Sequence, residues 1–265
     1  MRNHPWKEEK MSENLDEHLF WSVHQDLPRE GPGDDASTLR AYQMLTDLPP
    51  QPRILDIGCG PGAQTIVLVQ ASQGRVTAVD THQPFLDDLA NRAAQAGVTD
   101  RIEPVRMSMF DLHFEQPFDL LWSEGAIYII GFEEGLRAWR PLLKPGGCAA
   151  VTEATWLKPN APEAVTKFWA EAYPEMGTLE ENRSRTRRAG YRLIDHFTLP
   201  ESAWWENYYD PMATRIAKLR EDYADNPEAL RLLDMESDEI ELYRQYAEFY
   251  GYVFYIMQVD DHHKA

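Results

Sequence analysis

Cysteines, long apolar runs and positive charge are all scarce in this chain of 265 residues. Its two cysteines, Cys59 and Cys148, stand in neither a CxxC pair nor a metal-ligand spacing, which disfavours a disulfide framework or a bound metal. The N-terminus lacks the apolar stretch of a signal peptide, and no run reaches the roughly 18 apolar residues of a membrane span. We therefore expect a soluble cytoplasmic protein with no membrane partner.

The charge balance is strongly acidic. Lysine and arginine number 26 against 44 aspartates and glutamates, giving a formal net charge of −18. No basic run is present that could follow a phosphate backbone, so nucleic acid is not an expected partner. A small-molecule substrate is expected instead, and the pattern leaves open whether the protein forms a homodimer.

From Arg53 onward, short apolar runs alternate with helical patterns, which predicts an α/β fold with a parallel sheet built from βαβ units. Strands are expected over 53–57, 75–79, 101–105, 118–122, 148–154, 190–199 and 251–259. Helices are expected over 13–24, 36–47, 63–72, 84–96, 132–143, 162–172 and 179–189, with two or three more within 202–250. Asp35 is the expected cap of the second helix, and Lys144–Gly147 is expected to form a turn before the fifth strand.

These elements predict one structural domain with additions at both ends. Residues 1–50 are interpreted as an N-terminal helical cap and 51–200 as the ligand-binding core. Residues 201–250 form a helical insertion that is expected to cover the substrate pocket, and 251–265 contain the last strand and a tail.

The strongest local signal is ILDIGCGPGAQT (54–65), in which a predicted strand enters a glycine turn and then a helix. Gly58, Gly60 and Gly62 allow the backbone to turn tightly and approach a ligand beside the helix N-terminus. The spacing also satisfies the GxGxx[GA] form of dinucleotide-binding loops. Asp56 argues against that alternative, because its negative charge would face a pyrophosphate.

Asp80 ends the second predicted strand about 20 residues beyond the first glycine, where an acid accepts hydrogen bonds from ribose hydroxyls. Together, ILDIGCGPG (54–62), AVD (78–80) and LLKPGG (142–147) resemble the class I S-adenosylmethionine (SAM)-dependent methyltransferases. The resemblance implies a Rossmann-like, seven-stranded, mostly parallel sheet flanked by helices, and SAM as cofactor with S-adenosylhomocysteine as product.

Within that family the chain is most similar to small-molecule enzymes of the ubiquinone-biosynthesis and sarcosine/dimethylglycine type. WSEGAIYIIGF (122–132) and AYPE (172–175) resemble an uncharacterised bacterial branch of the group. A SAM-dependent methyltransferase acting on a small-molecule acceptor, with an amine as one candidate, is the function implied. An NAD(P)- or FAD-linked oxidoreductase and a non-catalytic SAM-binding protein of the same fold are the alternatives.

The resemblance also implies which residues hold the cofactor. Asp80 would hold the ribose, while Ser108 and Met109 would meet the adenine, with Asp111 as a substitute for the aspartate that the family often has at Ser108. The residues expected beside the methionine part and its amino group are Asp56, Gly58, Gly60, Gly62 and Ser123.

Methyl transfer requires an acceptor nucleophile about 3 Å from the methyl carbon, opposite the sulfur. Glu124 is the first candidate for an acceptor-facing catalytic group, although it could equally bind the SAM ammonium. Tyr128 would face the same pocket if a helix begins at Glu124. The remaining predicted pocket residues, some of which could instead be packing residues, are Glu153, Trp156, Trp204, Trp205 and Tyr208.

Overall fold

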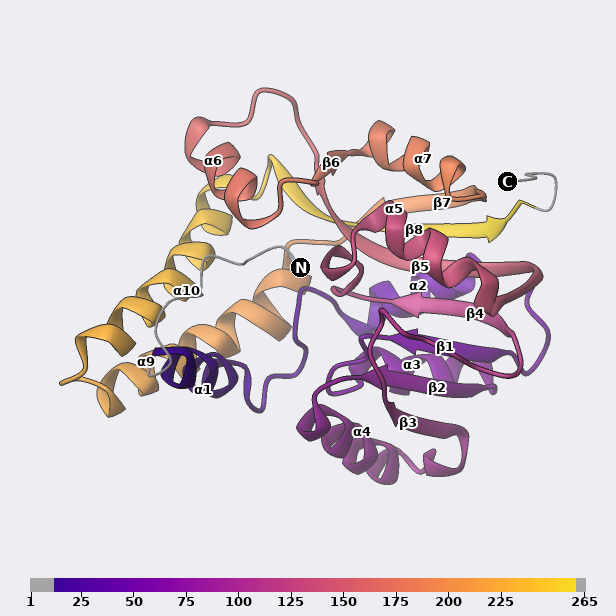
Figure 1. Cartoon of the computed structure of the whole chain (residues 1–265), viewed down its shortest axis with the longest axis horizontal. Coiled ribbons are helices and arrows are strands. Elements are labelled where there is room, and N and C mark those ends of the chain that lie inside the picture. The colour runs from indigo at the N-terminus through magenta and orange to yellow at the C-terminus, as the bar shows by residue number, and fades with distance from the viewer. Residues whose placement is uncertain (1–11, 261–265) are drawn as a thin grey trace.

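An eight-stranded sheet organises residues 12–260, which are the residues described by the computed structural model (Figure 1). Seven strands follow the order β3-β2-β1-β4-β5-β8-β7, and the short β6 pairs with β5. Strands β1 to β6 pair in parallel, whereas β8 runs antiparallel between β5 and β7. The strands are Arg53–Ile57 (β1), Arg75–Asp80 (β2), Ile102–Arg106 (β3), Phe118–Ser123 (β4), Leu143–Trp156 (β5), Gly177–Thr178 (β6), Tyr191–Thr198 (β7) and Tyr250–Val259 (β8).

The seven predicted strands are therefore present, with two differences. Strand β5 begins at Leu143, which was expected to end a helix, because Leu143 already pairs with Phe118 of β4, and the residues expected to form a turn are part of the strand. Gly146 has a φ of +67° there, and the pairing register between β4 and β5 is irregular in this region. The two-residue β6 has no apolar pattern and was not predicted.

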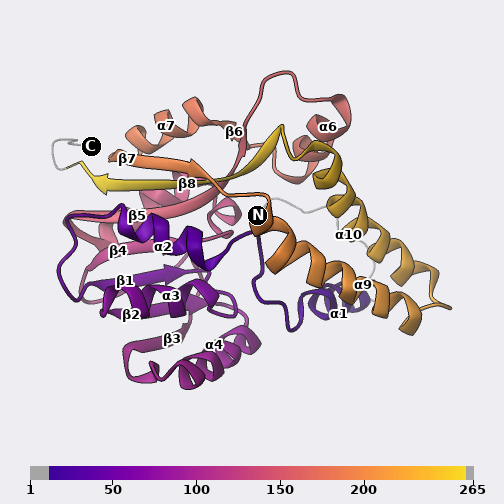
Figure 2. The ribbon, with the colours of Figure 1, turned by 180° about the vertical axis from the view of Figure 1, so that it is seen from behind.

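Helices cover both faces of the sheet (Figures 1 and 2). One face packs against α2, α3 and α4, and the other against α5 and α7. Neighbouring residues of β1 serve the two cores, since Ile54 packs on the first face and Leu55 on the second. The helices are Asp35–Gln43 (α2), Ala63–Ser72 (α3), Gln83–Ala96 (α4), Phe132–Trp139 (α5) and Leu179–Arg188 (α7).

Three helix ends differ most from the sequence prediction, and one of them is the end of α2, which lies at Gln43 rather than at 47. Asp34, not Asp35, caps α2, because the Asp34 side chain accepts the backbone N–H of Ser37. Helix α5 ends at Trp139, and Arg140–Leu142 continues as a 3-10 turn that contains a proline.

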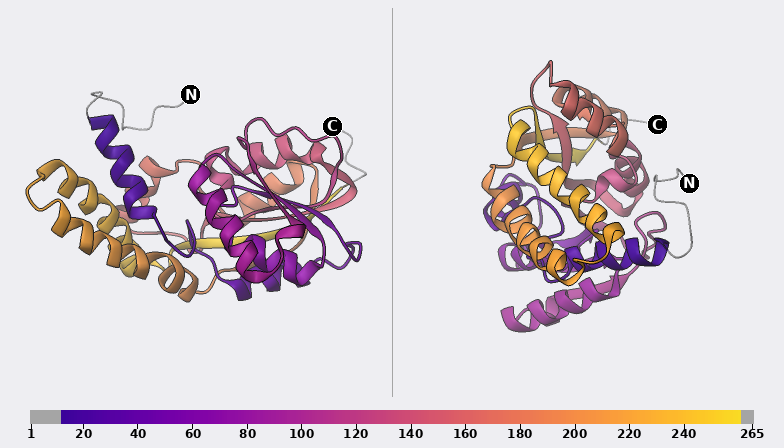
Figure 3. Two further views of the ribbon diagram at one scale, coloured as in Figure 1. Left: turned by 90° about the horizontal axis from the view of Figure 1, so that it is seen from below. Right: turned by 90° about the vertical axis from the view of Figure 1, so that its left-hand side faces the viewer.

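The remaining helices lie beyond the carboxyl ends of the parallel strands (Figures 1 and 3). Helices α9 and α10 lie side by side and α1 packs against both. The predicted N-terminal cap is therefore divided, since α2 belongs to the core and packs on α3. The helices are Ser12–His24 (α1), Glu163–Ala172 (α6), Ser202–Trp204 (α8), Asp210–Asp222 (α9) and Pro227–Tyr246 (α10), with a π-helix over Trp205–Tyr209. None of the helices in the described part of the chain has the length and apolar character to cross a bilayer.

Candidate functional site

The glycine turn after β1 is shaped by contacts that exclude side chains. Gly58, Gly60 and Gly62 have φ values of +70°, +52° and +84°. A Cβ at Gly58 would lie 2.5 Å from the Cβ of Ala126, and one at Gly62 would clash with the Leu89 side chain. Only glycine fits these two positions without strain. The turn consequently presents bare backbone at the end of β1, next to the N-terminus of α3.

Asp80, at the end of β2, faces this turn as predicted. Its Oδ2 accepts the backbone N–H of Gly60 at 3.0 Å, and its Oδ1 accepts that of His82 at 2.9 Å. Each carboxylate oxygen retains a second lone pair that can accept a further hydrogen bond. The carboxylate is thus fixed beside the glycine turn with acceptor capacity left for a ligand hydroxyl.

Asp56 is fully buried one residue before the end of β1. Its Oδ2 accepts the hydroxyl of Thr65 at 2.5 Å, whereas its Oδ1 has no hydrogen-bond partner. Burial raises the pKa of this carboxyl to about 7, against the opposing effect of the Thr65 hydrogen bond. A buried acceptor without a partner is costly unless a ligand or water supplies a donor. This orphaned oxygen is the kind of group that a ligand ammonium or hydroxyl would satisfy.

Glu30 provides a second such oxygen, and sequence analysis did not identify it. Its Cγ lies 3.5 Å from where a Cβ of Gly60 would be, so the side chain covers the glycine turn. Glu30 Oε2 pairs with His24 Nδ1 at 2.7 Å, while its Oε1 is buried without a partner. Burial raises the pKa of Glu30, and the bond to His24 opposes that effect. No local sequence motif predicts the position of Glu30, because that position depends on the path of the whole segment after α1 over the edge of the sheet.

Ser108 and Met109 follow β3, as expected for residues near an adenine. The Met109 Cε lies 3.7 Å from where a Cβ of Gly58 would be, so this side chain approaches the glycine turn. The Met109 carbonyl accepts the indole N–H of Trp139 at 3.0 Å, which holds the segment in place. Ser108 Oγ accepts the backbone N–H of Phe110 at 3.3 Å.

Ser123 and Glu124 have their polar atoms engaged within the protein. The Ser123 hydroxyl, fully buried, donates to the Ile57 carbonyl at 2.9 Å and so joins the ends of β4 and β1. Glu124 accepts three hydrogen bonds, from Arg29 at 3.0 Å, Thr38 at 2.7 Å and the Trp122 indole at 2.8 Å. Burial raises the pKa of Glu124, with the Arg29 charge opposing it. The Glu124 carboxylate therefore ties β4 to the segment between α1 and α2.

Tyr128 does not share a helix with Glu124, so the condition under which the two side chains would face one pocket is not met. Gly125 has a φ of +67°, and a short 3-10 helix begins only at Ile127. Tyr128 keeps 44% of its surface exposed, and its ring meets that of Tyr173 edge-on, with 5.9 Å between centroids.

The five predicted pocket residues do not form one group. Glu153 is buried on β5 and its Oε1 accepts the Tyr173 hydroxyl at 2.6 Å. Trp204 is buried and stacks on Tyr243 with 4.1 Å between ring centroids, while Trp205 lies under the Arg244 guanidinium. These two tryptophans pack against other side chains of the helical insertion. Tyr208 instead points back toward α1, with its ring 6.5 Å from that of His24.

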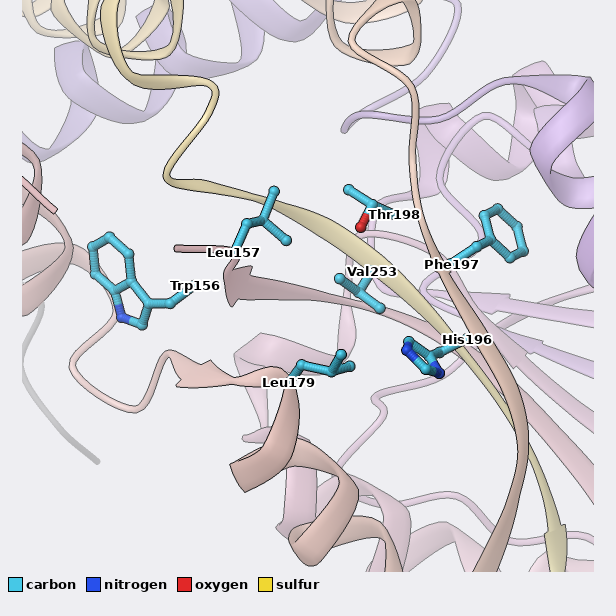
Figure 4. A pocket seen from close by; sticks show the side chains of 7 residues that line it. All are labelled: Trp156, Leu157, Leu179, His196, Phe197, Thr198 and Val253. Atoms are coloured by element: carbon cyan, nitrogen blue, oxygen red, sulfur yellow. The ribbon is translucent and has the colours of Figure 1, made fainter. Parts of the chain in front are cut away.

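Trp156 lines a separate pocket of about 310 Å³ between β5, β7, β8 and the start of α7 (Figure 4). The walls are mostly apolar and include one titratable side chain, His196. The lining residues are Trp156, Leu157, Leu179, His196, Phe197, Thr198 and Val253. None of the predicted cofactor residues is among them, so this pocket is distinct from the glycine turn.

The site can be compared with known proteins. Residues 54–147 match the family model of a methyltransferase domain. The structure of a SAM-dependent methyltransferase from Geobacter sulfurreducens in complex with S-adenosyl-L-homocysteine is similar, with a TM-score of 0.79 and 20% identity over 91% of this chain and 98% of that chain. A putative sarcosine dimethylglycine methyltransferase from Galdieria sulphuraria has a TM-score of 0.67 and 18% identity, with coverage of 86% and 85%.

A curated relative is the 27-O-demethylrifamycin SV methyltransferase of Amycolatopsis mediterranei, which is 28% identical over 187 residues, or 64% of this chain. The chain spans 65% of that relative's length and only 27% of another, from Synechococcus. The fold of this chain is that of the methyltransferase structures to which it is similar. Residues 54–147 match a methyltransferase domain, and this match favours a methyltransferase interpretation of the glycine turn over a dinucleotide-binding one.

Proposed function

We propose that this protein transfers the methyl group of SAM to a small-molecule acceptor. The observation that carries the proposal is the pair of buried, unpartnered carboxylate oxygens at the glycine turn, Asp56 Oδ1 and Glu30 Oε1. SAM carries an ammonium group, two ribose hydroxyls and a positive sulfonium, which match an acidic and acceptor-rich site. When bound, SAM supplies an electrophilic methyl carbon.

The residues of this chain would bind and orient that cofactor. Asp80 accepts the ribose hydroxyls, and the bare backbone of Gly58, Gly60 and Gly62 lies against the methionine part. Ser108 and Met109 flank the adenine. The hydrogen bond from Ser123 to the Ile57 carbonyl holds the ends of β4 and β1 together. Such positioning and the exclusion of water contribute a large part of the acceleration of a displacement reaction.

Glu124 and Tyr128 differ in how well they suit the acceptor side. The three hydrogen bonds that Glu124 accepts favour a positioning role, in which it fixes the Arg29 segment over the site. Tyr128 is partly exposed and retains a hydroxyl that can meet an acceptor. We therefore propose Tyr128 as the acceptor-facing residue of the two.

A small acceptor is supported by the helices that stand over the carboxyl edge of the sheet. Helices α1, α9 and α10 occupy the side from which a large polymer would approach (Figure 3). The net charge of −18 opposes nucleic acid as acceptor. The two free, buried cysteines support the reducing cytoplasm as the location.

Calorimetric titration with S-adenosylhomocysteine and, in parallel, with NADH tests the cofactor. We expect the first to bind and the second not to bind. Incubation with labelled SAM and a metabolite extract, followed by mass analysis, then identifies the methylated product. Binding of NADH alone would overturn the proposal, and cofactor binding without any labelled product would point to the non-catalytic alternative.

A further inference from the structure

The segment after α1 passes over the edge of the sheet where the parallel strands end (Figure 1). We call residues 21–30, from the last turn of α1 onward, the strap. The ion pair between Arg29 and Glu124 fastens one end of the strap directly after β4. Next to it, the Glu30 side chain covers Gly60 in the turn after β1. The strap therefore crosses the proposed cofactor site.

The other end of the strap is held by aromatic rings. Trp21 of α1 stacks on His82, with 3.7 Å between ring centroids and 9° between ring planes. The ring of Phe85, in the first turn of α4, meets both rings edge-on, at 5.7 Å from Trp21 and 4.6 Å from His82. The backbone N–H of His82 donates to Asp80. This stack thus lies two residues beyond the carboxylate that is proposed to hold the ribose.

The middle of the strap is held through its backbone. Arg92 of α4 donates from Nη1 to the Pro28 carbonyl at 3.0 Å and from Nη2 to the Leu27 carbonyl at 3.2 Å. On the other side, Arg215 of α9 donates to the Ser22 carbonyl at 2.8 Å. The strap is consequently fixed between the core of the protein and the helical insertion.

The two ends of the strap differ in how firmly they are held. The side chains of Arg29 and Glu124 are 6% and 5% exposed, and breaking a buried ion pair is costly. Trp21 and His82 are both partly exposed, and the stacking of two rings contributes less than a buried ion pair does. The end at Trp21 is therefore the end that opens more readily.

We propose that the strap closes the cofactor site and that the stack of Trp21 on His82 must separate for the cofactor to enter or leave. The inference rests on the proposed function and adds the exchange of S-adenosylhomocysteine for SAM at the same site. The stack joins two parts of the protein, so it holds the strap closed whether or not the cofactor is bound. Loss of the stack should therefore speed binding and release equally and leave the equilibrium affinity unchanged.

The test measures the association and dissociation rates of S-adenosylhomocysteine on the immobilised full chain by surface plasmon resonance. We expect Trp21→Ala and His82→Ala each to raise both rates about fivefold, with a change in Kd of less than about twofold. The double variant should be no faster than the faster single variant, because either substitution alone removes the stack. His82→Ala keeps the backbone N–H that Asp80 accepts, so it isolates the effect of the ring.

His18→Ala is the matched control, because it removes the same ring from an exposed position of α1, and it should leave both rates unchanged. Melting temperatures check that the variants fold, and His82→Ala decides alone if Trp21→Ala does not fold. Unchanged rates overturn the inference. Faster release with a proportionally weaker affinity also overturns it, because the rings would then contact the cofactor itself. Absence of S-adenosylhomocysteine binding to the wild-type protein instead removes the proposed function on which the inference rests.

Discussion

The cofactor side and the acceptor side of this protein are built in different ways. The cofactor side is largely encoded by one continuous stretch, 54–65, whose turn is completed by Asp80 from the next strand. The proposed acceptor side depends on Tyr128, from the 3-10 turn after β4, and on the helices α1, α9 and α10, which pack together from distant parts of the chain. A continuous stretch can be recognised from its own spacing, whereas a site assembled from distant segments depends on packing that no local pattern records.

The largest expected effect is on the free energy of unfolding, and it concerns the ion pair between Arg29 and Glu124 that joins the two sides. Arg29 and Glu124 are 6% and 5% exposed in their side chains, and they connect the N-terminal segment to β4. Glu124→Gln should lower the free energy of unfolding by about 3 kcal/mol, because the buried Arg29 charge then keeps only Asp35, an exposed carboxylate, as its partner. Urea denaturation measures the change.

The exposed pair Lys158 and Glu248 provides the control. Glu248→Gln should change the free energy of unfolding by at most about 0.5 kcal/mol, since water screens that pair. The double variant Arg29→Met with Glu124→Gln should recover part of the loss, because no buried charge remains. Similar losses for Glu124→Gln and Glu248→Gln would show that the two sides are not joined through this contact.

The next prediction concerns the rigidity of the cofactor side. Gly62→Ala should lower the free energy of unfolding by about 2 to 3 kcal/mol, from the positive φ and the clash with Leu89. Gly97 also has a positive φ, of +67°, but no atom lies within 4 Å of where its Cβ would be. Gly97→Ala should therefore lower the free energy of unfolding by only about 1 kcal/mol. Equal losses of unfolding free energy for Gly62→Ala and Gly97→Ala would mean that Leu89 moves aside and that the glycine turn is less rigid than its contacts suggest.

Much of the core fold was predictable because its signals are local. The bounds of β1 and α3 agree with prediction, since apolar runs and glycine punctuation lie within each element. Gly97 ends α4 in the left-handed conformation, as expected. Errors occurred where pairing or capping decided the outcome, as at Leu143, where strand pairing starts early, and Asp34, which caps α2 in place of its neighbour.

The residues of the candidate site likewise fall into those with a local sequence signal and those without one. The sequence predicted that Asp80 and the three glycines lie together, and the structure brings them together. It could not indicate Glu30, which resembles an ordinary solvated acid of a strongly acidic chain. Glu30 reaches the glycine turn only because the segment after α1 folds over it, which is a long-range property of the fold.

The ribose contact gives an expected effect of intermediate size. Asp80→Ala should weaken SAM binding at least about tenfold, or about 1.4 kcal/mol, by removing an acceptor for the ribose hydroxyls. Calorimetric titration measures it, and Asp87→Ala, which removes an exposed charge from α4, should leave the affinity unchanged. Unchanged affinity in Asp80→Ala would remove this residue from the site and weaken the contrast between the two sides.

The last prediction is a pH dependence of stability at Glu153. Burial raises the pKa of Glu153 from 4.5 to about 8, so the folded protein holds this proton more tightly than the unfolded chain does. Its contribution to stability is therefore fully present below about pH 4.5 and is lost as the pH rises through 8. Glu153→Gln does not titrate, so its stability relative to the wild type should increase by at least about 1 kcal/mol between the two ends of that range. Denaturation of the wild type and of Glu153→Gln at several pH values tests this. A stability difference that shifts the opposite way would mean that the Glu153 carboxylate already has a cationic partner. The contrast between the two sides of the protein would then be weaker.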